Sequence, residues 1–121
     1  MYNDSKYSGK HMICDFKNIK NTSLLNNKSA LEEICRTICM ENKLTILKEA
    51  THTFTPQGCT FLFLLSESHL SLHTFPERNY IAFDLYTCRE YPDDTIYTSI
   101  YQRFTELLNS TGSCQIINRE F

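Results

Sequence analysis

The segment from Leu65 to Cys88 holds the densest group of reactive side chains in the sequence. These are three carboxylates, two hydroxyls, two imidazoles and a thiol: Glu67, Ser68, His69, Ser71, His73, Glu77, Asp84 and Cys88. Covalent catalysis needs a hydroxyl or thiol beside a base, which makes Ser68 or Cys88 with His73 the candidate pairs. Side chains alternate along a strand, so Ser68 and His73 are expected on opposite faces unless a bend or bulge re-aims one. Spacing alone therefore assigns no catalytic pair.

Ordinary structural roles are open for several of these residues. Cys88 also suits a small buried hydrophobe, and Asp84 a residue on the polar face of a strand. The remaining histidines, His11, His52 and His69, receive no role. No second pair of Cys or His accompanies Cys35 and Cys39 at metal-ligand spacing, so these two are interpreted as core residues and no metal site is expected.

The elements that must position these side chains follow from hydrophobic periodicity and turn residues. Strands are predicted at 11–16, 44–54, 59–66, 69–74, 80–87 and 113–119, and helices at 26–42 and 93–110. The continuous apolar run 59–66 predicts a central strand that is buried on both faces. Turns are expected at Pro56-Gln57-Gly58 and at Pro76–Asn79.

Both helices have terminal and periodic signals. Ser29 with Glu32 three residues later forms a capping-box pattern at the first helix. The second helix places apolar residues on one stripe, namely Ile96, Ile100, Phe104, Leu107 and Leu108. The order strand, helix, strands, helix, strand predicts a single α/β domain over 1–121. Its expected architecture is a two-layer sandwich of a mainly antiparallel sheet with helices on one face.

Composition limits the classes of function. The chain has 121 residues and a formal net charge of -2, which gives no basic field for nucleic acid. Its longest apolar run, 61–65, is far shorter than the roughly 20 residues of a membrane span. The start, MYNDSKYSGK, lacks the apolar core of an export signal, so a cytoplasmic location is expected and the six cysteines are interpreted as thiols.

The stretch ESHLSLHTFPE followed by DLYTC resembles the signature of the short, prokaryotic-type S-adenosylmethionine decarboxylases. FTPQGCT and GKHMICDF resemble two further segments of that family, so the resemblance covers the chain from Gly9 to Cys88. It implies self-cleavage between Glu67 and Ser68 into a beta chain (1–67) and an alpha chain (68–121). Ser68 would then become a pyruvoyl cofactor, and no external cofactor would be required.

The same resemblance implies a role for each site residue. His73 would move a proton during cleavage, with Thr60 in support, and Cys88 would protonate the product of decarboxylation. The pyruvoyl carbonyl would condense with the substrate amine and accept electrons as carbon dioxide leaves. Phe54 and Phe75 would contact adenine or sulfonium, and Glu77 would be a polar contact.

The resemblance further implies a homodimer with each site at or near the subunit contact. The product would be decarboxylated S-adenosylmethionine, the aminopropyl donor for spermidine. Three positions depart from the common family pattern: Arg89 replaces glycine, Phe75 replaces tryptophan or tyrosine, and Cys59 replaces valine.

Other interpretations stay open at this point. Ornithine or arginine is an alternative substrate, because the walls of a pocket decide which amino acid enters. A non-catalytic regulatory relative, or an unrelated α/β interaction domain, is the alternative to an enzyme. Absence of self-cleavage would favour either of these two.

Overall fold

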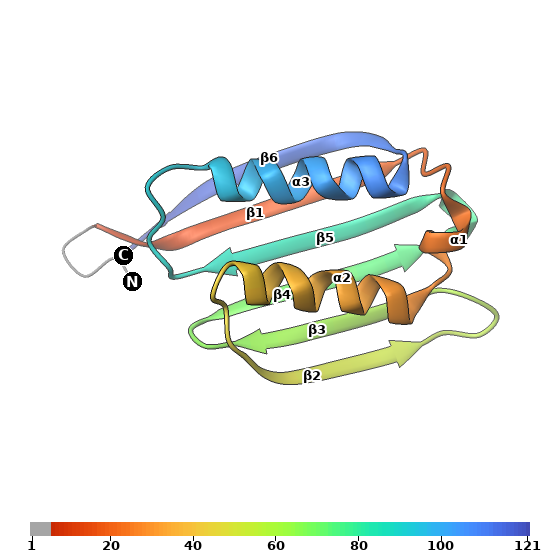
Figure 1. Cartoon of the computed structure of the whole chain (residues 1–121), viewed down its shortest axis with the longest axis horizontal. Coiled ribbons are helices and arrows are strands. Elements are labelled where there is room, and N and C mark those ends of the chain that lie inside the picture. Colours follow the sequence, from red (N-terminus) through yellow and green to blue (C-terminus); the bar gives the residue numbers. More distant parts are fainter. Residues whose placement is uncertain (1–5) are drawn as a thin grey trace.

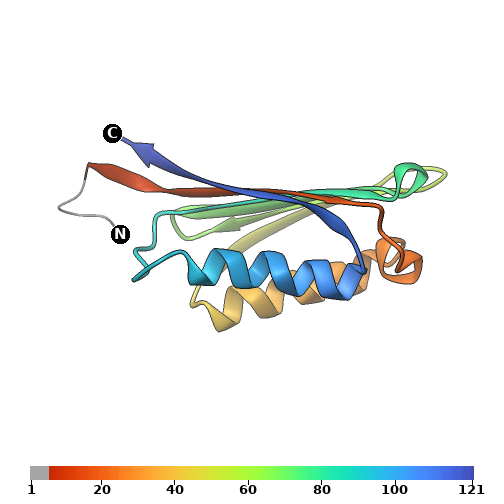
Figure 2. The same cartoon turned by 90° about the horizontal axis from the view of Figure 1, so that it is seen from above.

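The computed structural model describes residues 6–121 and forms two layers, a six-stranded sheet and helices that cover one of its faces (Figure 1, Figure 2). The strands are β1 Tyr7–Lys17, β2 Ile46–Thr53, β3 Cys59–Leu65, β4 Ser68–Phe75, β5 Tyr80–Thr87 and β6 Thr111–Glu120. The helices are α1 Thr22–Leu25, α2 Lys28–Glu41, α3 Thr95–Leu108 and a short 3-10 turn, η1, at Pro76–Arg78. Residues 1–5 lie outside the described residues, and they are part of the segment MYNDSKYSGK on which the expectation about an export signal rests.

The sheet has the order β2-β3-β4-β5-β1-β6, and every neighbouring pair is antiparallel. The second view shows α2 and α3 on the same side of the sheet, which leaves the other face open (Figure 2). The expected fold class, a two-layer sandwich with helices on one face, is therefore confirmed. Within residues 6–121, no helix combines the length and apolar character that crossing a membrane requires.

Side-chain alternation sorts each strand between the helix layer and the open face. In β4, Ser68, Leu70, Leu72 and Thr74 are buried, while His69, Ser71 and His73 alternate with them on the open face. The helices contribute the other half of the core, with Leu31, Cys35, Ile38 and Cys39 from α2 and Tyr97, Ile100, Phe104 and Leu108 from α3. The interpretation of Cys35 and Cys39 as core residues is thus confirmed.

The prediction that 59–66 is buried on both faces is wrong. Phe61 and Phe63 of β3 are fully buried, but Leu62 and Leu64 are 47% and 52% exposed on the open face. A run of apolar residues is therefore buried on one side only. The exposed leucines leave an apolar surface on the single chain.

Two details of the helices also differ from the predictions. The N-cap of α2 is Asn27, whose side chain accepts a hydrogen bond from the Ala30 backbone N–H, so Ser29 lies inside the helix. On α3, Tyr97 is buried where Leu107 was expected, and Leu107 is 40% exposed. The stripe is rotated because Tyr97 places its hydroxyl 2.7 Å from that of buried Thr87.

Candidate active site

Ser68 begins β4 directly after the tight turn Ser66-Glu67, which joins it to β3. Leu65 and Ser68 lie opposite each other, so only two residues form the loop. The backbone φ of Glu67 is 62°, a left-handed conformation that residues other than glycine disfavour. The residue that precedes Ser68 is therefore held in a strained conformation.

Cys88 lies beside Ser68 at the end of the neighbouring strand. The backbone N–H of Cys88 donates to Ser68 Oγ at 3.3 Å, and the Cys88 thiol donates to the Tyr86 hydroxyl at 3.6 Å. Ser68 is 7% exposed, and Cys88 is partly exposed. We define Glu67, Ser68 and Cys88 as the hairpin group.

Three neighbours of the hairpin group, Tyr86, Lys43 and Arg89, were not assigned to the site in the sequence analysis, although Arg89 was noted as a departure from the family pattern. Tyr86 precedes Cys88 by two residues, and the alternation of a strand was the signal that it shares the face of the thiol. Arg89 and Lys43 line a cavity of about 170 Å³ together with the turn residues 66–68, and the Arg89 guanidinium donates to the Lys43 carbonyl at 3.4 Å. The arginine that replaces a family glycine thus adds a cation to the lining of this cavity.

The other predicted site residues gather at the opposite end of β3 and β4. Thr60 and His73 lie opposite each other in the register, and Thr60 Oγ1 is 2.9 Å from His73 Nδ1. They line a cavity of about 330 Å³ with Phe54, Phe75 and Glu77. We define these five residues as the loop group.

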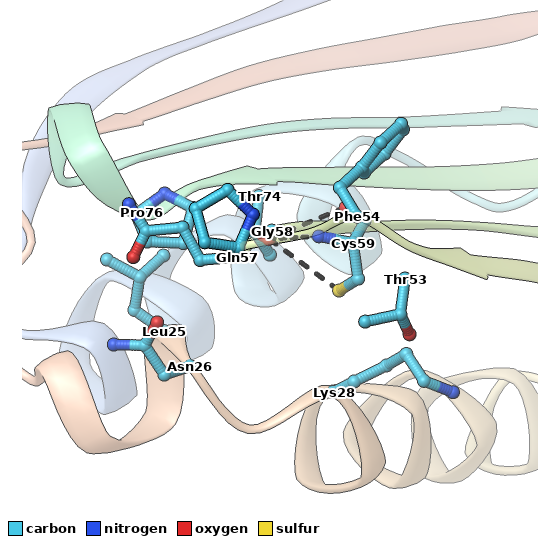
Figure 3. Close-up of a pocket in the computed structure, with 11 residues that line it drawn as sticks. Leu25, Asn26, Lys28, Thr53, Phe54, Gln57, Gly58, Cys59, Thr74 and Pro76 are labelled. Atoms are coloured by element: carbon cyan, nitrogen blue, oxygen red, sulfur yellow. Dashed lines mark hydrogen bonds between the residues drawn. The ribbon is translucent and has the colours of Figure 1, made fainter.

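The β2–β3 loop that carries Phe54 is fixed by backbone and side-chain hydrogen bonds. Phe54 N–H donates to the Gly58 carbonyl at 2.8 Å, and Cys59 N–H donates to Thr74 Oγ1 at 2.8 Å (Figure 3). Gly58 has a φ of 95°, which favours glycine, and a side chain there would approach the Thr74 carbonyl. The loop separates the loop-group cavity from a second cavity of about 240 Å³ beside α1 and the start of α2.

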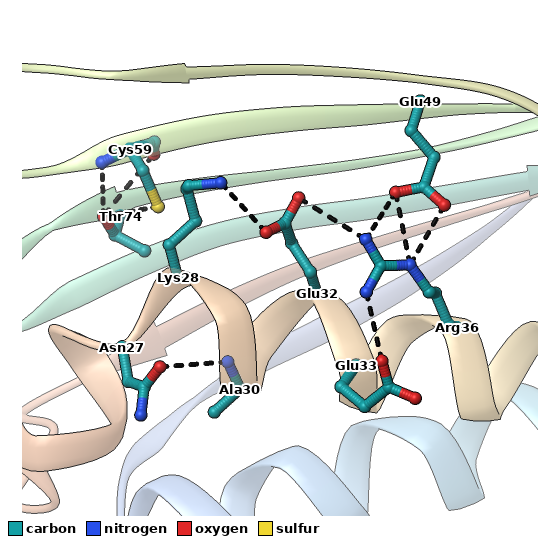
Figure 4. Close-up of polar contacts among 9 residues, drawn as sticks. All are labelled: Asn27, Lys28, Ala30, Glu32, Glu33, Arg36, Glu49, Cys59 and Thr74. Carbon is teal, nitrogen blue, oxygen red and sulfur yellow. Dashed lines mark hydrogen bonds and ion pairs between the residues drawn. The ribbon is translucent and has the colours of Figure 1, made fainter.

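Ion pairs between α2 and β2 support the strand that leads to Phe54. Arg36 binds both carboxylate oxygens of Glu49, with contacts of 2.7 and 3.0 Å, and also pairs with Glu33 (Figure 4). The hydrogen bond from Arg36 holds the pKa of the Glu49 carboxyl below its usual value. Lys28 reaches the buried Glu32 at 3.0 Å from the preceding turn of the helix.

The open face between the two groups carries a polar cluster around Asp84. His11 Nε2 lies 2.6 Å from Asp84 Oδ2, and Ser71 donates to the other carboxylate oxygen. Burial by itself raises the pKa of Asp84, but the hydrogen bonds from Ser71 and His11 outweigh it and hold that pKa below its usual value. The carboxylate is therefore ionised at neutral pH.

The structure does not bring the two groups together within one chain. Ser68 and His73 are five residues apart along β4, which at the usual rise of a strand is about 17 Å. They also face opposite sides of the sheet, as the alternation predicts. Contact between the hairpin group and the loop group requires a second chain or a large rearrangement.

Comparison with known proteins identifies the family. The model of the S-adenosylmethionine decarboxylase family matches residues 10–112 of this chain. The chain belongs to this family. The match extends beyond Cys88, where the sequence resemblance ends, and includes α3.

Individual relatives agree with the family assignment. An S-adenosylmethionine decarboxylase proenzyme from Methanococcus aeolicus is 37% identical over 93 residues, which cover 75% of this chain and 79% of the relative. One from Prochlorococcus marinus is 42% identical over 80 residues, covering 66% and 63%. The crystal structure of the adenosylmethionine decarboxylase from Aquifex aeolicus superposes with a TM-score of 0.80 at 24% identity. It covers 97% of this chain and 94% of that one, which shows the shared fold.

Proposed function

We propose that this chain is a self-processing, pyruvoyl-dependent S-adenosylmethionine decarboxylase whose cofactor derives from Ser68. Family membership supports the decarboxylase, and the relatives named above are proenzymes. The observation that carries the proposal is the turn at Glu67, since a left-handed residue directly before a buried serine suits a peptide bond that must break.

Cleavage divides the chain into 1–67 and 68–121. Ser68 Oγ attacks the carbonyl carbon of Glu67, so a C–O bond forms, the C–N bond breaks and the amide becomes an ester. Elimination then releases the carboxylate of Glu67, and water replaces the nitrogen of residue 68, which leaves as ammonia. A base must take the hydroxyl proton and an acid must protonate the amine, and His73 supported by Thr60 has the groups for both.

The surroundings of Ser68 fit a pyruvoyl group. When formed, it would act as an electron sink for decarboxylation of an amino acid. The Cys88 backbone N–H donates to Ser68 Oγ, the oxygen that attacks Glu67 and leaves with its carboxylate, so this donor would stabilise negative charge on that oxygen during cleavage. The Cys88 thiol, partly exposed beside Tyr86, is positioned to return a proton to the substrate carbon.

The proposal includes a homodimer, because the two groups of site residues are separated in one chain. The open face bears exposed Leu62, Leu64 and Ile117, a surface that a second copy would cover. An antiparallel, twofold packing of two open faces would bring the turn at Glu67 and the Cys88 side chain of one chain over the loop group of the other, so that the partner's His73 could reach the Glu67–Ser68 bond at the end of the sheet. His73 and Thr60 of the partner subunit would then complete each site.

The walls of the loop-group cavity favour S-adenosylmethionine as substrate. Phe54 and Phe75 are 49% and 39% exposed, so two aromatic faces are available to adenine and to a sulfonium cation. Glu77 is the one carboxylate among the lining residues. Ornithine and arginine could pair with Glu77, but neither has a ring to stack between two aromatic side chains, so the pair of aromatic walls favours S-adenosylmethionine.

The intact mass of freshly purified protein under denaturing conditions tests the processing step. Wild type is expected as two fragments divided between Glu67 and Ser68, the second blocked by pyruvoyl, and Ser68→Ala as one uncut chain. Ser66→Ala is the matched control in the same turn and is expected to cleave. An uncut wild type, or cleavage of Ser68→Ala at the same bond, would contradict the proposal.

A further inference from the structure

Three strands bring together two of the histidines that the sequence left without a role. His11 on β1 and His69 on β4 both lie opposite Tyr86 of β5, and Asp84 is two residues before Tyr86 on the same face. Residues that are far apart in the sequence thus converge on one spot of the open face. The strand register brings the side chains of His11, His69 and Asp84 together, and none of the three belongs to the hairpin group or the loop group.

The donor atoms of this cluster lie close enough together for small side-chain rotations to bring them around one ion. His11 Nε2 lies 2.6 Å and His69 Nε2 lies 3.5 Å from Asp84 Oδ2, and one ligand atom from each of the three residues lies within 4.8 Å of the others. Two ligands at about 2 Å from one zinc ion can be at most about 4 Å apart. Both imidazoles would have to rotate to bind one ion, because 2.6 Å is a hydrogen-bond distance and shorter than the separation of two zinc ligands, and the His69 side chain is 50% exposed.

We propose that His11, His69 and Asp84 form a binding site for one divalent transition-metal ion of the zinc type. Two imidazoles and one carboxylate are a donor set that zinc, cobalt and nickel accept, whereas magnesium and calcium prefer oxygen ligands alone. Three protein ligands leave a further coordination position for water. The site is assigned from the residues of this chain and does not depend on the proposed decarboxylase activity.

The surroundings orient the ligands as metal sites require. Ser71 donates to Asp84 Oδ1, which is the usual role of a hydroxyl behind a carboxylate ligand, while Oδ2 faces His11 and His69 and would exchange its contact with His11 for the ion. The Tyr86 ring stacks on His69 with centroids 5.8 Å apart and meets His11 edge-on at 5.9 Å, which restricts both imidazoles. Arg119 lies over the Tyr86 ring at 5.9 Å and is a cation near the site.

The bound ion would join β1, β4 and β5 at the centre of the open face, the face that we propose pairs with a second copy. Tyr86 also receives the Cys88 thiol hydrogen bond, so the site lies one side chain away from the hairpin group. The ion is therefore expected to stabilise the fold, because a ligand that binds only the folded chain raises the free energy of unfolding in proportion to the logarithm of the ligand concentration.

Titration of the full chain, stripped with a chelator, with Co²⁺ tests the site by visible absorption. One equivalent is expected to bind with the spectrum of four- or five-coordinate cobalt, to be displaced by Zn²⁺ and to raise the melting temperature. His11→Gln and Asp84→Asn are expected to abolish this spectrum, and Ser71→Ala to weaken binding by about 10-fold. His52→Gln removes an exposed histidine from the edge strand β2 and is the matched control that keeps full binding.

Circular dichroism of each variant without metal establishes that it is folded before its titration is interpreted. The proposal is overturned if the wild type takes up no cobalt, or if folded His11→Gln and Asp84→Asn bind as the wild type does. It is also overturned if the spectrum contains a thiolate-to-cobalt charge-transfer band, since that would place the ion on cysteine. The proposal is likewise overturned if His52→Gln loses as much cobalt binding as His11→Gln and Asp84→Asn do.

Discussion

At the scale of single residues, Ser68 and Cys88 are neighbours because two adjacent strands end together. Antiparallel pairing of β4 with β5 brings Ser68, the first residue of β4, next to Cys88, which directly follows β5, although twenty positions separate them in the sequence. The backbone of Cys88 contacts Ser68, while its side chain contacts Tyr86. One residue can therefore contact Ser68 through its backbone and take the proposed role of proton donor through its side chain.

Replacement of Cys88 separates processing from decarboxylation. Cys88→Ala keeps the backbone N–H at Ser68 but removes the thiol, so self-cleavage is expected to continue while the turnover number falls about 100-fold or more. Cys114→Ala is the matched control, because that thiol is also partly exposed and lies on β6. Intact mass and release of carbon dioxide measure the two steps. An unchanged turnover number in Cys88→Ala would show that the Cys88 thiol is not the proton donor.

The sequence identifies the reactive residues but not their three-dimensional grouping. The resemblance named all three members of the hairpin group, and alternation correctly placed Ser68 and His73 on opposite faces. The separation of the loop group from Ser68, and the meeting of His11 with Asp84, depend on strand order, which local pattern does not encode. Tyr86 was recognisable only once Cys88 was assigned to the end of a strand.

At the scale of elements, hydrophobic periodicity predicts whether each long segment is a helix or a strand. Local hydrogen bonds and packing then change where the element begins and which residue caps it. The six predicted strands are all present, although β1 begins at Tyr7 and β6 at Thr111, earlier than their apolar cores suggest. Asn27 displaces Ser29 as N-cap because its carboxamide oxygen accepts from the Ala30 N–H, so the helix begins two residues earlier than the capping-box pattern requires. The short α1 has only four residues and no periodic signal.

The contact between α2 and β2 predicts a dependence of stability on pH. The folded pKa of Glu49 is lowered from 4.5, so the stabilisation is present above pH 4.5 and is lost as pH falls through the folded pKa. Glu49→Gln is expected to lower the free energy of unfolding at pH 7 by about 1 kcal/mol or less, because the pair is partly exposed. Below the folded pKa, the variant and the wild type are expected to be equally stable.

Urea unfolding at pH 7 and at acidic pH measures this difference. Glu106→Gln is the matched control, because Glu106 is an exposed carboxylate on α3 that forms no ion pair with another described residue. If the free energies of unfolding of Glu49→Gln and the wild type differed by the same amount at every pH, the ion pair would not be the cause of the difference.

At the scale of the whole molecule, the open sheet face and the divided site have one explanation in the proposed dimer. The order of the strands could not be obtained from the sequence, since β1 inserts between β5 and β6, and its neighbours are distant in the chain. The apolar residues of β3 predicted burial, and the structure leaves Leu62 and Leu64 exposed on the single chain. A second copy would bury them and supply the missing half of each site.

Co-expression of two inactive variants tests the division of the site between subunits. Ser68→Ala has no serine to cleave, and His73→Ala lacks the imidazole, so neither is expected to process efficiently alone. In a mixed dimer, the Ser68→Ala chain supplies His73 to the His73→Ala chain, and only the latter is expected to be cleaved. Different masses distinguish the chains. No cleavage in the mixed sample, with mixed dimers shown to form, would contradict the divided site.

The central claim is that residue 68 carries the carbonyl that binds S-adenosylmethionine. The most direct measurement is the fragment mass after incubation of purified protein with S-adenosylmethionine and cyanoborohydride, followed by denaturation. The fragment 68–121 is expected to gain the mass of one reduced, substrate-derived adduct, while 1–67 stays unchanged and ornithine or arginine adds nothing. An unmodified fragment 68–121, or an adduct formed with ornithine or arginine in place of S-adenosylmethionine, would contradict the account.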